Sequence, residues 1–118
     1  LDGDGAVLMH MGSLAVAGSA QLENFVHVLF NNGAHETVGG MPTVSEKIDY
    51  LEVAKGCGYE NIYTAETEEE VISLFEKITK AKGSVFAEIK TNLLSRADLG
   101  RPTTTPVQNK EAFMEFLK

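Results

Sequence analysis

Strand-like segments alternate with helical ones along this chain, and this alternation is the feature that most constrains its fold. The segments typical of strands are residues 24–30, 61–65 and 84–90. Helical spacing separates the last two, because Val71, Leu74 and Ile78 recur along one face. Strands that alternate with helices form a parallel sheet, since each crossover returns the chain to the same edge. The sequence therefore predicts an α/β domain over residues 1–118, a three-layer parallel sheet with helices on both faces.

Local signals predict where helices and loops begin and end. Thr67 and Glu70 have the spacing of a capping box, and Gly83 is expected to stop the helix that follows. Segment 31–45 is rich in glycine and is predicted to be a loop. Asn109 is expected to cap a last helix that carries an apolar side.

Composition excludes several classes of function. A chain of 118 residues with a net charge of -7 and no basic run is not expected to bind nucleic acid. No apolar run reaches the roughly 18 residues of a membrane-spanning helix, so no membrane contact is expected. The single cysteine, Cys57, is interpreted as a small buried residue at a helix end. Together with the absence of a cationic leader, it favours a cytoplasmic protein.

The first residues suggest a piece of a longer polypeptide. The chain begins at Leu1, without an initiator Met and directly at a Gly-Asp-Gly turn. A parallel sheet normally supplies a strand that leads into such a turn, so we expect further sequence upstream.

Two short motifs are expected to meet at one edge of the sheet. Gly3-Asp4-Gly5 is separated from Asn31-Asn32 by residues 6–30, which suffice for one helix and one strand. Loops at the carboxyl ends of parallel strands form the ligand crevice of such folds. The carboxylate of Asp4 and the amide oxygen of Asn32 are hard ligands suited to Mg²⁺. Gly3 and Gly5 allow backbone N–H groups to approach a phosphate closely, at the positive end of a helix.

This paired motif resembles the signature of thiamine diphosphate (ThDP) enzymes of the pyruvate decarboxylase and acetolactate synthase type. The resemblance implies that Asp4 and the side chain of Asn32 bind Mg²⁺, with the backbone oxygen of Ala34 as third ligand. It also implies that Gly5 and Ala6 donate N–H groups to the diphosphate. An unrelated pair of turns is the alternative interpretation of the same residues.

Three blocks narrow the resemblance to phosphonopyruvate decarboxylases, with sulfopyruvate decarboxylases as close relatives. The blocks are residues 1–14, residues 31–36 together with 38–43, and residues 95–106, the last of which starts at Ser95. The implied reaction is ThDP-dependent decarboxylation of a 2-oxoacid, with 3-phosphonopyruvate giving phosphonoacetaldehyde and CO2. Acetolactate-synthase-like carboligation remains an alternative. So do a non-catalytic phosphate- or nucleotide-binding module and a regulatory subunit that has only the fold.

Further polar residues are candidates for contact with the substrate. His35 and Glu36 follow the proposed metal ligands, and each is a candidate for substrate contact or proton transfer. Arg96 and Arg101 can each bind a phosphonate through two N–H groups, and the alternative for their loop is a subunit contact or a brace across the domain. His27 is predicted to be a hydrogen-bonded core histidine, and His10 to be packed.

The resemblance also implies partners. In such enzymes a separate pyrimidine-binding domain, on the same or a partner subunit, supplies the glutamate that activates the cofactor. We therefore expect a homo-oligomer with a small 2-oxoacid as substrate, and no decarboxylase activity from this polypeptide alone.

Overall fold

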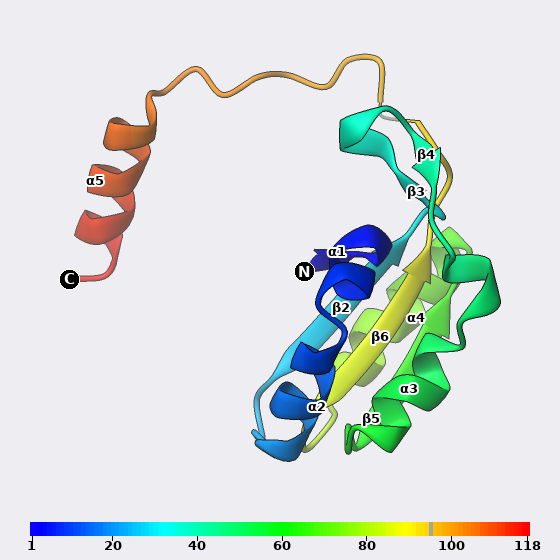
Figure 1. Cartoon of the computed structure of the whole chain (residues 1–118). Helices are drawn as coiled ribbons and strands as arrows, with labels where there is room; N and C mark the ends of the chain where they lie inside the picture. The colour runs from blue at the N-terminus through cyan, green and yellow to red at the C-terminus, as the bar shows by residue number, and fades with distance from the viewer. Residues whose placement is uncertain (95) are drawn as a thin grey trace.

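Figure 1 shows the computed structural model, which describes residues 1–94 and 96–118. A four-stranded parallel sheet with strand order β1-β2-β6-β5 lies at its centre. Its strands are β1 (Asp2–Gly3), β2 (Val26–Asn31), β5 (Asn61–Ala65) and β6 (Val85–Lys90). A small antiparallel hairpin is formed by β3 (Ala34–His35) and β4 (Met41–Pro42). The parallel sheet predicted from the alternation of segments is confirmed.

Helices cover both faces of this sheet, which gives the predicted three layers. The helices are α1 (Asp4–Met9), α2 (Gly12–Ser19), α3 (Tyr50–Gly56), α4 (Glu68–Ile78) and α5 (Pro106–Phe116), with single 3-10 turns η1 (Glu36–Val38) and η2 (Ser45–Lys47). The side chains of α1, α2 and α3 share one apolar cluster with Leu29 and Phe86 of the sheet. On the opposite face, Leu74 of α4 packs with Val28 and Ala87. Adjacent residues of β2 therefore point into different clusters, as expected of a strand inside a parallel sheet.

The two predicted capping signals have different outcomes. Thr67 and Glu70 form a complete capping box at the start of α4, which confirms that prediction. The prediction for Asn109 is wrong, because α5 begins at Pro106 and Thr105 accepts the capping bond from the N–H of Gln108. A proline at the first helical position favours this earlier start, since it has no N–H that needs a partner.

Three other local predictions are also corrected. Gly83 does not stop α4, which ends at Ile78. Gly83 instead takes a φ of +87° in the turn before β6, a conformation that glycine adopts without strain. Segment 31–45 is not only a loop, because the β3–β4 hairpin lies within it. His10 is exposed rather than packed.

The C-terminal helix stands apart from the sheet. Figure 1 shows α5 at the end of an extended segment, at a distance from the layered body. None of its residues is buried. Within residues 1–94 and 96–118, no helix combines the length and apolar character needed to cross a bilayer.

Candidate functional site

A pocket opens where the carboxyl ends of β1 and β2 meet. Gly3 is paired with Phe30 in the parallel ladder, so the carboxyl ends of β1 and β2, at Gly3 and Asn31, lie next to each other. The pocket has a volume of about 610 Å³. The predicted cofactor, metal and catalytic residues that line it are Gly3, Asp4, Gly5, Ala6, Asn32, Ala34, His35 and Glu36. The fold thus gathers into one pocket the polar residues of two motifs that are distant in sequence.

Asp4 is a buried carboxylate held by hydroxyl groups. It is 2% exposed, and its Oδ2 accepts hydrogen bonds from Thr43 Oγ1 at 2.5 Å and from Ser45 Oγ at 2.6 Å. Tyr50 OH lies 2.8 Å from Ser45 Oγ, and the Ser45 proton already points to Asp4, so the phenol is the donor. Burial raises the pKa of Tyr50, and the nearby carboxylates of Asp4 and Glu88 add to this effect. Both bonds to Asp4 reach one oxygen, which leaves Oδ1 available to a ligand in the pocket.

The Asn31-Asn32-Gly33 turn is shaped by its own side chains. Asn31 Oδ1 accepts the N–H of Gly33 at 3.1 Å, and Asn32 Oδ1 accepts the N–H of Ala34 at 3.1 Å. Gly33 itself has a φ of +70°, which explains why glycine follows the asparagines. Asn32 Nδ2 donates to Glu36 Oε2 at 3.0 Å. The Asn32 oxygen keeps a second lone pair, so one hydrogen bond does not exclude a metal ion.

Ala34, the predicted third metal ligand, also lines the pocket. Its partner across the β3–β4 hairpin is Pro42. Proline has no N–H, so the residue opposite Ala34 donates nothing to the Ala34 carbonyl. One carboxylate, one amide and one carbonyl form an all-oxygen donor set that fits Mg²⁺. In the described residues there is no cluster of three or more His, Cys, Asp or Glu side chains suited to a metal ion, and the donor set above contains only one such group.

The first turn of α1 supplies backbone donors to the same pocket. Gly3 is the N-cap and offers no side-chain acceptor, so the first N–H groups of the helix are not capped. Gly5 and Ala6 both line the pocket. A Cβ atom on Gly5 would overlap the imidazole ring of His35, whereas one on Gly3 would meet open space. The ring of His35 is therefore a steric reason for glycine at position 5, in addition to the predicted approach of a phosphate.

Comparison with known proteins identifies the family of this domain. The family model described as "Thiamine pyrophosphate enzyme, C-terminal TPP binding domain" matches residues 1–89. The chain belongs to this family. The resemblance drawn from the Gly-Asp-Gly and Asn-Asn motifs is thereby confirmed, and TPP is another abbreviation for ThDP.

Relatives of this ThDP-binding domain carry the names of two decarboxylases. The phosphonopyruvate decarboxylase of Streptomyces viridochromogenes is 32% identical over 117 residues, 99% of this chain and 30% of that protein. That of Streptomyces hygroscopicus is 32% identical over 98% of this chain and 29% of its own length. The sulfopyruvate decarboxylase subunit beta of Methanocaldococcus jannaschii is also 32% identical, over 100% of this chain and 62% of that subunit. The chain thus spans about 30% of the phosphonopyruvate decarboxylases that it matches.

A solved structure supports the fold. An X-ray structure of a candidate thiamin diphosphate-dependent enzyme from Mycobacterium smegmatis superposes with a TM-score of 0.56 at 22% identity. The match covers 78% of this chain and 17% of that protein. At this level of identity the likeness extends to the fold only.

His35 and Glu36 line the pocket of the ThDP-binding domain and differ in exposure. His35 is the last residue of β3 and is half-buried beside Gly5, whereas Glu36 begins η1 and is exposed. Glu36 is hydrogen-bonded to Asn32, so its carboxylate lies next to a proposed metal ligand. Apolar side chains complete the wall, among them Met9 and Met41.

The two arginines predicted to bind substrate lie outside this pocket. Arg96 pairs through Nε with Asp98 Oδ1 at 2.8 Å, and its side chain is 72% exposed. Arg101 is exposed in the segment that leads to α5. Neither lines the pocket, so their contact with substrate remains a prediction. Ser95, which begins the third resembling block, lies outside the described residues.

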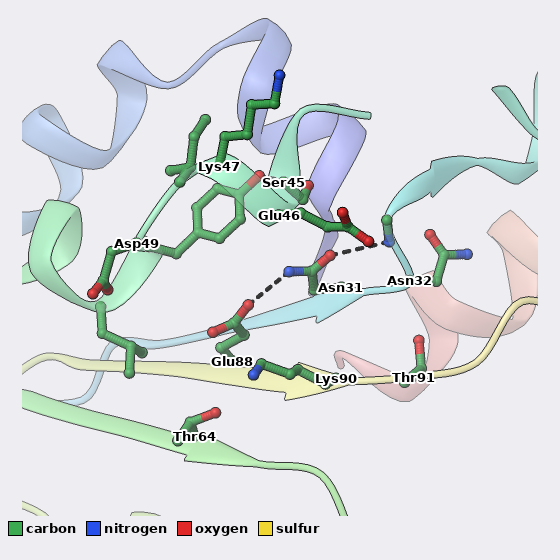
Figure 2. Close-up of a pocket in the computed structure, with 14 residues that line it drawn as sticks. Asn31, Asn32, Ser45, Glu46, Lys47, Asp49, Thr64, Glu88, Lys90 and Thr91 are labelled. Carbon is green, nitrogen blue, oxygen red and sulfur yellow. Dashed lines mark hydrogen bonds between the residues drawn. The ribbon is translucent and has the colours of Figure 1, made fainter. Parts of the chain in front are cut away.

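Sequence reasoning missed the residues that support the site from behind. The hydroxyl groups of Thr43 and Ser45 donate hydrogen bonds to Asp4. No sequence pattern predicts such a bond between residues so far apart in the chain. Glu88 gave a clearer signal, because it is a charged residue within the otherwise apolar run from Val85 to Ile89. It lines a second pocket of about 760 Å³, which shares Asn32 and Thr91 with the first (Figure 2).

Proposed function

We propose that this chain forms the diphosphate- and Mg²⁺-binding half of the active site of a ThDP-dependent 2-oxoacid decarboxylase. The proposed substrate is 3-phosphonopyruvate, and the products are phosphonoacetaldehyde and CO2. The observation that carries the proposal is the convergence of Asp4, Asn32 and Ala34 on one pocket with the uncapped first turn of α1. The names of the phosphonopyruvate decarboxylases that match almost the whole chain support the choice of substrate.

The residues of this chain would bind and orient the cofactor. Asp4 Oδ1, the side-chain oxygen of Asn32 and the carbonyl of Ala34 would hold Mg²⁺, which in turn neutralises the diphosphate. The N–H groups of Gly5 and Ala6 would donate to the diphosphate, at the positive end of α1. Gly3 would leave space for this approach. When bound, the cofactor supplies the thiazolium that accepts the electron pair released with CO2.

His35 and Glu36 are proposed to act where substrate meets the pocket. An imidazole ring can both accept and donate a proton, so His35 suits proton transfer to or from a reacting group. Glu36 is hydrogen-bonded to Asn32 and would couple the metal ligand to the same region. Arg96 and Arg101 are proposed to bind the phosphonate, because a guanidinium group can bind two anionic oxygens at once.

Sulfopyruvate is the second candidate substrate. The Methanocaldococcus jannaschii subunit is as similar to this chain as the phosphonopyruvate decarboxylases are, at 32% identity. That relative is named as a beta subunit, which implies at least one further subunit. Either way, we propose that a pyrimidine-binding domain, on the same or a partner subunit, completes the site within a homo-oligomer or a complex.

Cofactor binding is the direct test of the proposal. ThDP binding to the natural gene product, with its partner subunit if it has one, is measured by calorimetry with Mg²⁺ and again after EDTA treatment. We expect binding that requires Mg²⁺ and is lost in Asp4→Ala and Asn32→Ala. Asp98→Ala is the matched control, since Asp98 is an exposed carboxylate outside the pocket, and it should bind normally. Equal binding by Asp4→Ala and the wild type would refute the assignment.

Product analysis then separates the substrates. The protein is incubated with phosphonopyruvate, sulfopyruvate or pyruvate, and the aldehydes are identified. Release of phosphonoacetaldehyde as the fastest reaction is expected, whereas sulfoacetaldehyde as the main product would favour the second candidate.

A further inference from the structure

We propose that Glu88 is a positioning residue of the cofactor site. Through Asn31 it would fix the turn that presents Asn32 and Ala34 to the metal ion. The inference rests on the proposed function, and it assigns a role to a buried carboxylate that does not itself face the first pocket.

The position of Glu88 requires a hydrogen-bonding partner. It is 6% exposed and lies in β6, in which every residue from Val85 to Ile89 is buried. A carboxylate at such a place is costly unless a donor satisfies it. In the parallel ladders it is paired with Leu29 of β2 and Thr64 of β5, so it sits in the interior of the sheet.

Asn31 supplies that donor. Its Nδ2 donates to Glu88 Oε1 at 2.7 Å, as the dashed line in Figure 2 shows. Among the described residues, Asn31 is the one side chain that is hydrogen-bonded to Glu88. The neighbouring Lys90 is engaged elsewhere, because its ammonium group pairs with Glu66 at 2.5 Å.

This bond fixes the orientation of the Asn31 amide. A carboxylate can only accept, so Glu88 selects the NH2 end of the amide and turns Oδ1 toward the chain that follows. Oδ1 then accepts the N–H of Gly33 at 3.1 Å (Figure 2). Without Glu88, the amide could rotate and present its NH2 group to Gly33, which would break this bond.

The turn continues directly into the proposed metal ligands. Gly33, held by Asn31, has a φ of +70° and reverses the chain. The next N–H, that of Ala34, donates to Asn32 Oδ1. Two consecutive side-chain turns therefore connect the buried carboxylate to both Asn32 and Ala34. A change at Glu88 is expected to act on metal and cofactor binding without touching either ligand.

A reciprocal exchange of the two side chains tests the inference. Asn31→Asp alone places two carboxylates against each other, and it should weaken Mg²⁺-dependent ThDP binding by about tenfold or more. In the double variant Asn31→Asp/Glu88→Gln, the new amide donates to the new carboxylate, which still accepts the N–H of Gly33. Binding should then recover to within about threefold of the wild type, since the hydrogen-bond pattern is restored.

The experiment uses the natural gene product, and the readout is the dissociation constant of ThDP from calorimetry at saturating Mg²⁺. Glu76→Gln is the matched control, because Glu76 is an exposed glutamate of α4 that lines neither pocket, and it should bind normally. If Asn31→Asp does not fold, the uncharged variants Asn31→Ala and Glu88→Leu replace it and should each weaken binding. Their thermal unfolding is measured in parallel to verify that they are folded.

The outcomes separate this inference from the proposed function. Wild-type protein that shows no Mg²⁺-dependent ThDP binding would overturn both. Wild-type binding, combined with normal binding by the single variants or with no recovery in the double variant, would overturn only the role of Glu88.

Discussion

Gly5 shows how a single hydrogen atom in place of a side chain shapes the site. The residue is buried at the start of α1, with the imidazole of His35 against its Cα. Any larger residue at this position would compete with His35 for the same space. The position thus links the first motif to the β3–β4 hairpin, which would not be suspected from glycine's role in phosphate binding alone.

Gly5→Ala is therefore expected to destabilise the domain. The methyl group forces His35 to rotate or the backbone to shift, at a cost of about 1–3 kcal/mol in the free energy of unfolding. The measurement is chemical denaturation of the 118-residue chain.

Gly3→Ala is the control, because its Cβ meets open space and its φ of -93° suits any residue, so it should unfold near the wild-type midpoint. A further change of His35→Ala in the Gly5→Ala background should restore part of the loss. Equal midpoints for Gly3→Ala and Gly5→Ala would show that His35 does not constrain position 5.

The residues of the site could be predicted from the sequence only where they belong to a recognisable motif. Asp4 and Asn32 belong to short patterns whose spacing matches one helix and one strand, so their meeting follows from the parallel sheet. Thr43 and Ser45 could not be foreseen, because their contact with Asp4 depends on the path of the loop after the hairpin. Glu88 could be recognised as unusual from its apolar surroundings, but its partner Asn31 lies across the sheet and becomes evident only from the register.

At the scale of elements, the part of the chain that the structure describes contains two complete capping boxes in different environments. Thr67 and Glu70 begin α4, and Thr105 and Gln108 begin α5. Hydrogen bonds from the N–H groups of Glu66 and Thr67 lower the pKa of Glu70. The Glu70 carboxylate therefore stays ionised to a lower pH than that of a free glutamate. The two helices differ in packing, because α4 buries Leu74 against the sheet and α5 buries no residue.

Removing the same hydroxyl from each box should have unequal effects. Thr67→Ala leaves an N–H without its acceptor at the start of a packed helix, and should lower the free energy of unfolding by about 1 kcal/mol. Thr105→Ala removes the same bond from α5, which contributes nothing to the core, so the main unfolding transition should not move. Denaturation followed by circular dichroism measures both. Equal shifts for the two variants would mean that α5 unfolds together with the sheet.

The elements themselves were largely predictable from the sequence. The strands β2, β5 and β6 were found from the sequence, and the apolar runs of β2 and β6 are those expected of parallel strands buried on both faces. The β3–β4 hairpin was missed, since its two-residue strands are too short for any periodicity. The start of the last helix was placed at Asn109 because asparagine is a good cap. The helix starts earlier because Thr105 and Gln108 form a capping box and Pro106 stands at the first helical position, where its missing N–H costs nothing.

At the scale of the whole molecule, a buried histidine connects three segments of the fold. His27 in β2 is 8% exposed, as predicted for a hydrogen-bonded core residue. Its Nε2 lies 2.9 Å from Asp2 Oδ2 in β1, and its Nδ1 lies 3.1 Å from Tyr59 OH, before β5. Burial raises the pKa of Tyr59 to about 12, so the phenol stays protonated and donates to Nδ1. Nε2–H then donates to Asp2, which defines one neutral tautomer of His27.

This arrangement makes the stability of the chain dependent on pH. Burial lowers the pKa of His27 below its usual 6.5, against the opposing pull of Asp2. The unfolded chain therefore takes up a proton on His27 more readily than the folded chain does. The stability that neutral His27 provides is complete above pH 6.5, and it is lost as the pH falls through the lower pKa of the folded state. Protonation would also put a proton on Nδ1, so the Tyr59 hydroxyl would have to turn its own proton away and accept instead. Denaturation midpoints compared at about pH 7.5 and about pH 5.5 should show lower stability at the acidic value, where free carboxylates are still largely ionised. The chain has three histidines, so a variant with His10→Gln and His35→Gln isolates His27 and should retain the full difference. In His27→Gln the difference should shrink, and an unchanged difference there would assign the pH dependence to another group.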